Sequence, residues 1–117
     1  MRCVSIRVEP DELAAALAER TFPPFLVTVG PEGGAHLVAV AVTLADGDLV
    51  VHGAGRTTLA NLGLRSEVTL AWAPPEPDGY SMIVDGVAHA EGDALRVVVT
   101  SAVLHRPAPT PPSPPSR

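Results

Sequence analysis

Tight-turn sequences separate the apolar segments of this chain, and they constrain its fold more than any other feature. Residues 30–34 read Gly-Pro-Glu-Gly-Gly, residues 45–48 read Ala-Asp-Gly-Asp and residues 91–93 read Glu-Gly-Asp. Turns this short join neighbouring antiparallel strands, whereas a parallel sheet needs a long crossover between successive strands. The sequence therefore predicts a mainly β domain with an antiparallel sheet.

The apolar runs between these turns predict six strands. A small antiparallel β-barrel accommodates them, because closure removes exposed strand edges. Side chains fill a barrel of this size, so any ligand is expected on the outside of the barrel or in a cleft between subunits. The expected strands are residues 25–29, 35–44, 49–52, 67–72, 80–89 and 94–104.

Two short helices complete the predicted fold. Residues 10–12 read Pro-Asp-Glu, which is a favourable helix start, and the Pro-Pro pair at residues 23–24 ends any helix before it. Apolar side chains at positions 13, 14, 17 and 18 form a stripe, which indicates a lid packed against the sheet. A second helix is expected over residues 58–64, with Leu59, Leu62 and Leu64 facing inward.

Composition limits the classes of partner. The chain has 117 residues, a net charge of −5 and 46% hydrophobic residues, enough for one domain with a real core. Because it lacks a basic cluster, neither nucleic acid nor an anionic membrane is an expected partner. The apolar excess favours a homodimer.

Further features indicate the compartment and the domain limits. Cys3 is the single cysteine, which fits a reducing compartment, and no signal-peptide-like or membrane-spanning run is present, so a cytoplasmic location is expected. Residues 1–106 are expected to form one domain. Residues 107–117 are rich in Pro, Ser, Ala and Thr, which is typical of a disordered Pro-rich tail.

The segment Gly53-Ala54-Gly55-Arg56-Thr57-Thr58 carries the main functional signal. It leaves a predicted strand and opens a predicted helix. Free backbone N–H groups, the helix dipole, the Arg56 charge and two hydroxyl groups could together cradle a phosphate. The alternative is a plain loop in which Thr57 or Thr58 caps the helix. Spacing alone favours the plain loop, and only the rest of the chain supports the phosphate cradle.

Other chemistry-bearing residues favour structural roles. Asp85-Gly86 interrupts an apolar strand, which indicates a β-bulge, with a place at a dimer cleft as the alternative. Trp72 is expected to anchor the core or an interface rather than stack on a cofactor. The four histidines are dispersed without metal-type spacing, so no metal site is expected.

The ordered set of segments resembles the pyridoxamine-phosphate-oxidase-like, FMN-binding split-barrel superfamily, in particular small actinobacterial members. The resemblance covers residues 10–106. The resemblance implies a six-stranded antiparallel split β-barrel with Greek-key-like connections and two short helices. Members of that superfamily form dimers and bind a flavin, a deazaflavin or sometimes haem at the subunit interface. The matching segments are residues 25–29, 34–40, 46–51, 56–62, 68–72 and 79–88.

The resemblance implies cofactor contacts from the second strand, the end of the third strand and the start of the following helix. At that helix start the superfamily often carries a Lys or Arg, where this chain has Thr57 or Thr58, and Arg56 could substitute. No catalytic residue is implied. The implied cofactor-binding residues are His36, Leu37, Val38, Val40, His52, Gly53, Arg56, Thr57, Thr58 and Asn61.

Three functions remain open at this point. The first is an oxidoreductase that binds FMN or a deazaflavin coenzyme and acts on an unidentified small molecule, in which the cofactor supplies the hydride chemistry. The second is a non-catalytic flavin- or haem-binding protein or sensor. The third is a structural dimer with a degenerate site and no cofactor, which the missing basic residue at Thr58 would favour.

Overall fold

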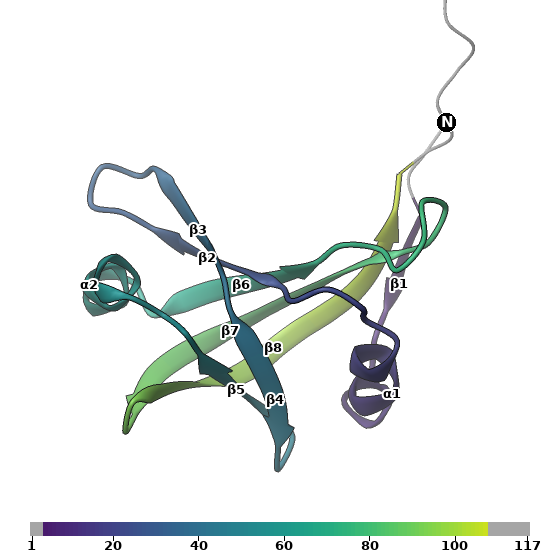
Figure 1. The fold of residues 1–117 in the computed structure, drawn as a ribbon, viewed down its shortest axis with the longest axis horizontal. Helices are drawn as coiled ribbons and strands as arrows, with labels where there is room; N and C mark the ends of the chain where they lie inside the picture. Colours follow the sequence, from purple (N-terminus) through teal and green to yellow (C-terminus); the bar gives the residue numbers. More distant parts are fainter. Residues whose placement is uncertain (1–3, 108–117) are drawn as a thin grey trace, which may run out of the picture.

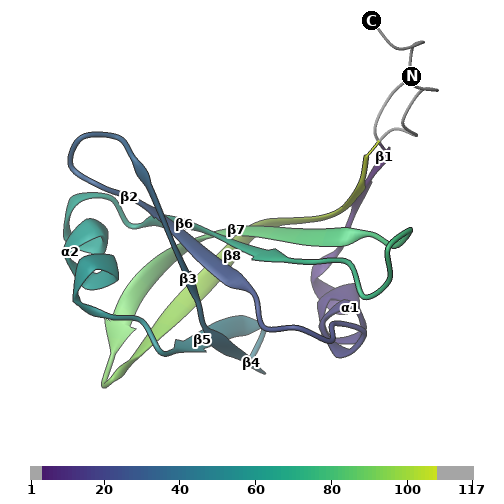
Figure 2. The same cartoon turned by 45° about the horizontal axis from the view of Figure 1, so that its top comes forward.

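The computed structural model describes residues 4–107, which form a curled antiparallel sheet with two short helices (Figures 1 and 2). The predicted mainly β fold is confirmed. Cys3 and all but the first residue of the expected tail lie outside the described residues. The elements are β1 (Val4–Arg7), a 3-10 turn (Pro10–Glu12), α1 (Leu13–Ala18), β2 (Phe25–Val29), β3 (Ala35–Ala39), β4 (Ala41–Ala45), β5 (Asp48–His52), α2 (Arg56–Leu64), β6 (Glu67–Trp72), β7 (Ser81–Glu91) and β8 (Ala94–Arg106).

One bent segment rolls the sheet into a split barrel. The hydrogen-bonded order is β3-β2-β6-β7-β8-β5-β4, and the two strands at its ends, β3 and β4, are consecutive in the chain. Figure 1 shows them as one long ribbon that crosses the others. β3 pairs with β2, and β4 pairs with β5. A single segment therefore borders both ends of the sheet.

The strand count differs from the expected six for two reasons. The expected strand 35–44 is divided at Val40, whose N–H donates to the Pro24 carbonyl (3.1 Å) while its side chain enters the core. From β3 into β4, more buried and exposed side chains continue to alternate across Val40. The sequence pattern therefore does not reveal the bend. The additional strand β1 pairs with the C-terminal half of β8.

The barrel interior is filled by aliphatic side chains, as predicted for a barrel of this size. Trp72 is buried at the end of β6, which confirms its expected role as a core anchor. In the apolar run Val97-Val98-Val99 of β8, Val97 is buried and Val98 is exposed, so only one face of this run packs in the core. The fully buried members of the core include Leu26, Leu49, Val51, Leu70, Met82, Val84, Leu95 and Val97.

The helices differ from expectation in their buried faces. In α1, Leu13 is buried but Ala14 and Ala18 are exposed, so the stripe is only partly covered. In α2, the expectation for two leucines is wrong: Leu59 is 48% exposed and Leu64 is 59% exposed, whereas Thr58 and Asn61 are buried. The helix begins at Arg56. Its inward face carries Asn61, which donates a hydrogen bond to Thr28 on β2.

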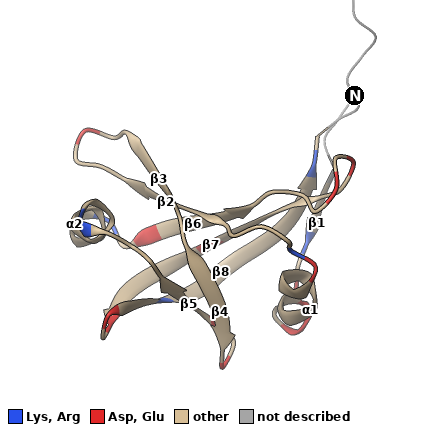
Figure 3. Cartoon of the chain, in the orientation of Figure 1, with Lys and Arg blue, Asp and Glu red and all other residues tan. Residues whose placement is uncertain are grey.

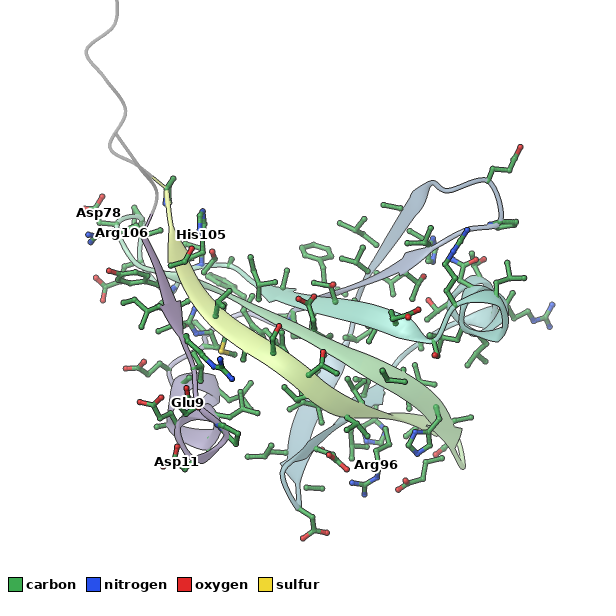
Figure 4. All side chains as sticks on the ribbon, turned by 180° about the vertical axis from the view of Figure 1, so that it is seen from behind. Glu9, Asp11, Asp78, Arg96, His105 and Arg106 are labelled. Atoms are coloured by element: carbon green, nitrogen blue, oxygen red, sulfur yellow. The ribbon has the colours of Figure 1, made fainter. Side chains whose placement is uncertain are left out.

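Arg96 ties two turns of the barrel together. Its guanidinium donates to both Glu91 carboxylate oxygens (2.7 and 3.3 Å), to the Asp48 carboxylate (3.1 Å) and to the Ala45 carbonyl (3.3 Å). Figure 4 shows Arg96 between the β4–β5 turn and the β7–β8 turn. The hydrogen bond from Arg96 lowers the pKa of the Glu91 carboxyl, so this link holds above the ordinary glutamate pKa and is lost as pH falls through the lowered value.

Charged residues are concentrated away from the curled strands. β2, β3 and β4 contain no Lys, Arg, Asp or Glu, as Figure 3 shows. The outer side of these strands is therefore an uncharged surface.

Within residues 4–107, no helix is long and apolar enough to cross a membrane.

The predicted β-bulge is confirmed at Asp85 and Gly86, where the pairing of β7 with β8 shifts register. A Cβ atom at Gly86 would lie 2.6 Å from the Val97 Cγ1 atom and 2.6 Å from the Val98 carbonyl oxygen. Glycine is therefore required here by close packing against neighbouring backbone.

We expect Gly86→Ala to lower the free energy of unfolding by about 1–3 kcal/mol, because the added methyl group meets backbone that cannot move aside freely. Gly34→Ala is the matched control, since nothing lies within 4 Å of a Cβ at that turn residue. Urea unfolding of both variants measures the difference. Equal stability of the two variants would contradict the close-packing explanation.

Candidate functional site

The exit from β5 leads directly into a helix with an open N-terminus. Gly53 has a φ of +96°, a conformation that favours glycine, and turns the chain away from β5. Gly55 occupies the N-cap position in an extended conformation and has no side chain to cap the helix. The first N–H groups of α2 are thus left for other acceptors, with the positive end of the helix dipole beside them.

Arg56 and Thr57 are exposed in the first turn of α2. Within residues 4–107, Arg56 makes neither a side-chain hydrogen bond nor an ion pair. A full positive charge, a hydroxyl group and open backbone donors therefore lie together at one helix end. This combination fits a phosphate or another small anion.

Thr58 and Asn61 lie on the opposite, inward side of α2. The Asn61 Nδ2 atom donates to the Thr28 Oγ1 atom on β2 (3.0 Å), and all three residues are buried. Thr58 Oγ1 is the only buried side-chain polar atom in residues 4–107 that has no hydrogen-bond partner. Because this face is covered, the two residues hold the helix against the barrel, whereas Arg56 and Thr57 face solvent.

An open hollow lies beside the end of β5. It has a volume of about 390 Å³ and is lined by Pro23, the β3–β4 bend at residues 39–41, and His52 and Gly53. His52 and Ala41 are directly paired across β4 and β5. The structure thus brings the predicted residues Val40, His52 and Gly53 together. It also adds Pro23, Ala39 and Ala41, which no sequence motif had singled out.

The predicted residues of β3 are divided between two faces. His36 lies opposite Thr28 and Val38 opposite Leu26, and both side chains are half-buried. Leu37 is exposed on the other face. Because β3 pairs only with β2, the backbone groups along its other edge have no strand partner in the part of the chain that the structure describes. These groups are available as donors and acceptors for a ligand.

The histidines do not assemble a metal site. His105 lies 3.3 Å from the Ser5 hydroxyl oxygen, near the far end of the barrel. Across residues 4–107, no three His, Cys, Asp or Glu side chains come together in a way that could hold a metal ion.

Two curated proteins are similar to this chain in sequence. They are the uncharacterized protein Mb0449c of Mycobacterium bovis and the uncharacterized protein MT0457 of Mycobacterium tuberculosis. Each is 42% identical over 118 residues, and the match covers 87% of this chain and 82% of the relative. No protein-family model matches the chain.

Solved structures share the fold at low sequence identity. A candidate 5-nitroimidazole antibiotic resistance protein from Bacteroides thetaiotaomicron superposes with a TM-score of 0.67 at 11% identity, covering 91% of each chain. A FAD-binding protein from Mesorhizobium loti gives 0.66 at 9% identity, covering 92% of this chain and 100% of the other. An F420 reductase gives 0.53 at 17% identity, covering 80% and 91%. Two of these neighbours are thus named for a flavin or a deazaflavin.

We expect Asn61→Ala to lower the free energy of unfolding by about 1–3 kcal/mol, because it removes the donor to the buried Thr28 hydroxyl group. Thr57→Ala on the exposed side of the same helix should change stability by less than about 0.5 kcal/mol. Urea unfolding with an unchanged slope measures both effects. A similar loss in both variants would show that Asn61 does not anchor α2.

Proposed function

We propose that the chain is a member of the pyridoxamine-phosphate-oxidase-like, flavin-binding split-barrel superfamily, whose fold it shares, and that it binds a flavin-type cofactor beside the end of β5 and acts as an oxidoreductase on a small molecule. The observation that carries the proposal is the open N-terminus of α2, with Arg56 and Thr57 exposed next to the His52–Gly53 hollow. A cofactor phosphate would bind at this helix end.

The hollow and the free edge of β3 fit the remaining part of such a cofactor. At the β3–β4 bend the hollow is lined by two small residues, Ala39 and Ala41, and by Val40, whose side chain is buried in the core. A flat ring can therefore approach the backbone at this bend. Leu37 on the exposed face of β3 and the unpaired backbone groups of that edge would contact the ring. Flavin mononucleotide and a deazaflavin both present a ring system and a phosphate, so the arrangement accommodates either.

The cofactor supplies hydride transfer when it is bound, and the residues described here bind and orient it. Arg56 contributes the charge that pairs with phosphate, and Thr57 and the α2 N–H groups contribute hydrogen bonds. Thr58, at the position where related proteins often carry a basic residue, is buried against the barrel. Phosphate affinity in this chain therefore depends on one arginine.

We expect Arg56→Ala to weaken binding of flavin mononucleotide or the deazaflavin by about 10- to 100-fold, because one charge-assisted contact to phosphate is lost. Fluorescence titration of the purified protein with each cofactor in parallel measures the affinities. Arg7→Ala is the matched control, since this exposed arginine pairs with Glu9 on the surface. Unchanged affinity in Arg56→Ala would remove Arg56 from the site, and saturable binding of neither cofactor would overturn the proposal.

A homodimer is the second part of the proposal. The outward positions of β2, β6, β7 and β8 form a mostly apolar face, and a hollow of about 530 Å³ lies on it. Near its middle, the Asp85 carboxylate accepts hydrogen bonds from the hydroxyl groups of Thr69 (2.6 Å) and Ser101 (3.3 Å). An apolar face of this extent favours association with a second copy. Its exposed or half-buried apolar members are Phe25, Val27, Val29, Ala71, Ile83, Val87, Val98 and Val103.

We expect Val87→Asp to shift the protein from dimer to monomer, because a second charge would be desolvated on the apolar face. Thr43→Asp is the matched control, since this exposed residue lies on β4, outside the face. Light scattering coupled to size-exclusion chromatography gives the mass of each variant. A monomeric starting protein, or a dimeric Val87→Asp variant, would contradict this assignment of the interface.

A further inference from the structure

A second, larger cavity adjoins the hollow at the end of β5. It has a volume of about 490 Å³, which lies in the range of pockets that hold small organic molecules. It opens between α1, the segment 20–24 and β4. Most of its lining residues are apolar, and Arg20 is the only charged residue among them. The lining residues include Ala14, Arg20, Phe22, Val40, Leu44 and Trp72.

Arg20 is held in place by backbone carbonyl groups. Its Nη1 atom donates to the Tyr80 carbonyl oxygen (2.6 Å), and its Nε atom is 3.4 Å from the Ala16 carbonyl oxygen. The side chain is half-buried, and no hydrogen bond of Nη2 is formed within residues 4–107. The guanidinium group is thus fixed at the cavity with donor capacity remaining.

No carboxylate neutralises this arginine within residues 4–107, although the chain has 13 acidic and 8 basic residues. Arg7 and Arg96, by contrast, both pair with carboxylates. A half-buried cation is less screened by water than a fully exposed one, so an incoming anion gains more from it than from a surface arginine. The charge at the cavity is therefore complementary to an anionic ligand.

The walls of the cavity favour an apolar body on that ligand. Phe22 is 58% exposed at the rim, and Leu44 is also exposed, so both would lose contact with water when a ligand enters. Trp72, although largely buried, lines the same space. Apolar surface covered in this way stabilises a complex by roughly 25 cal/mol per Å².

We infer that the cavity between α1 and β4 binds a small organic anion that has an apolar or aromatic body and a carboxylate group paired with Arg20. Pro23, Val40 and Ala41 line both this cavity and the hollow beside His52. A ligand in the cavity is therefore next to the cofactor position, and its role as the substrate rests on the proposed function.

The chain contains its own reporter for this site, because Trp72 is its single tryptophan and lines the cavity. Trp72 fluorescence is followed while 4-phenylbutanoate is added to the full-length protein without any cofactor. The uncharged 4-phenylbutanamide is the matched probe. We expect saturable binding of the carboxylate and at least about 10-fold weaker binding of the amide, since the amide forms no charge-assisted contact.

Variants separate the charge from the shape. Arg20→Gln should weaken carboxylate binding by about 10- to 100-fold and abolish the preference over the amide, whereas Arg20→Lys should retain part of it. Ala14→Phe should weaken binding of the carboxylate and, wherever it is measurable, of the amide by filling the cavity. Ala15→Phe, at an exposed position of α1 that does not line the cavity, should change neither. Circular dichroism verifies that each variant is folded.

Two results would overturn the inference. One is the lack of a saturable Trp72 signal with 4-phenylbutanoate up to about 10 mM, which corresponds to a negligible affinity. The other is equal binding of the carboxylate and the amide together with no effect of Ala14→Phe or Arg20→Gln. Because no cofactor is added, the outcome is independent of the flavin titration. Carboxylate binding without flavin binding would uphold the anion site and remove only its assignment as a substrate site.

Discussion

The bend at Val40 is the constraint on which the rest of the structure depends. Its N–H group donates to the Pro24 carbonyl while its side chain packs in the core. One continuous segment therefore pairs with β2 before the bend and with β5 after it. This exchange of partners curls the sheet, and it places the β3–β4 bend against Pro23 and the end of β5. Both the hollow at His52 and the cavity beneath α1 include Val40 in their walls. The barrel closure and the candidate binding region thus have the same physical origin.

Polar contacts, rather than leucine packing, orient the helix that carries the anion site. The buried hydrogen bond between Asn61 and Thr28 joins α2 to β2. An unpaired amide in this position would be costly, so the bond favours one rotation of the helix over others. In that rotation Arg56 and Thr57 face solvent at the open N-terminus. By fixing the rotation of α2 about its axis, Asn61 therefore also determines where Arg56, the residue proposed to bind phosphate, is presented.

Two arginines, Arg56 and Arg20, would bind the two anionic groups of the proposed ligands. Arg56 lies at an exposed helix end, where a phosphate would be bound in contact with water. Arg20 is half-buried and fixed by backbone carbonyl groups beside an apolar cavity, where a carboxylate on an apolar body would be bound. Neither arginine is neutralised by a carboxylate within residues 4–107. In a chain with a net charge of −5, each of these arginines would favour an anionic ligand at its own site.

The sequence by itself determined the antiparallel fold, because short glycine turns permit few other connections between apolar runs. It also determined the bulge at Asp85–Gly86 and the buried position of Trp72, since both follow from local pattern and residue size. Only the tertiary structure decided the bend at Val40, because the alternation of inward side chains continues through it. The buried face of α2 was likewise decided by a contact between Asn61 and Thr28, 33 positions apart in the chain. The cavity at Arg20 depends on three separated segments meeting, and no local motif records such a meeting.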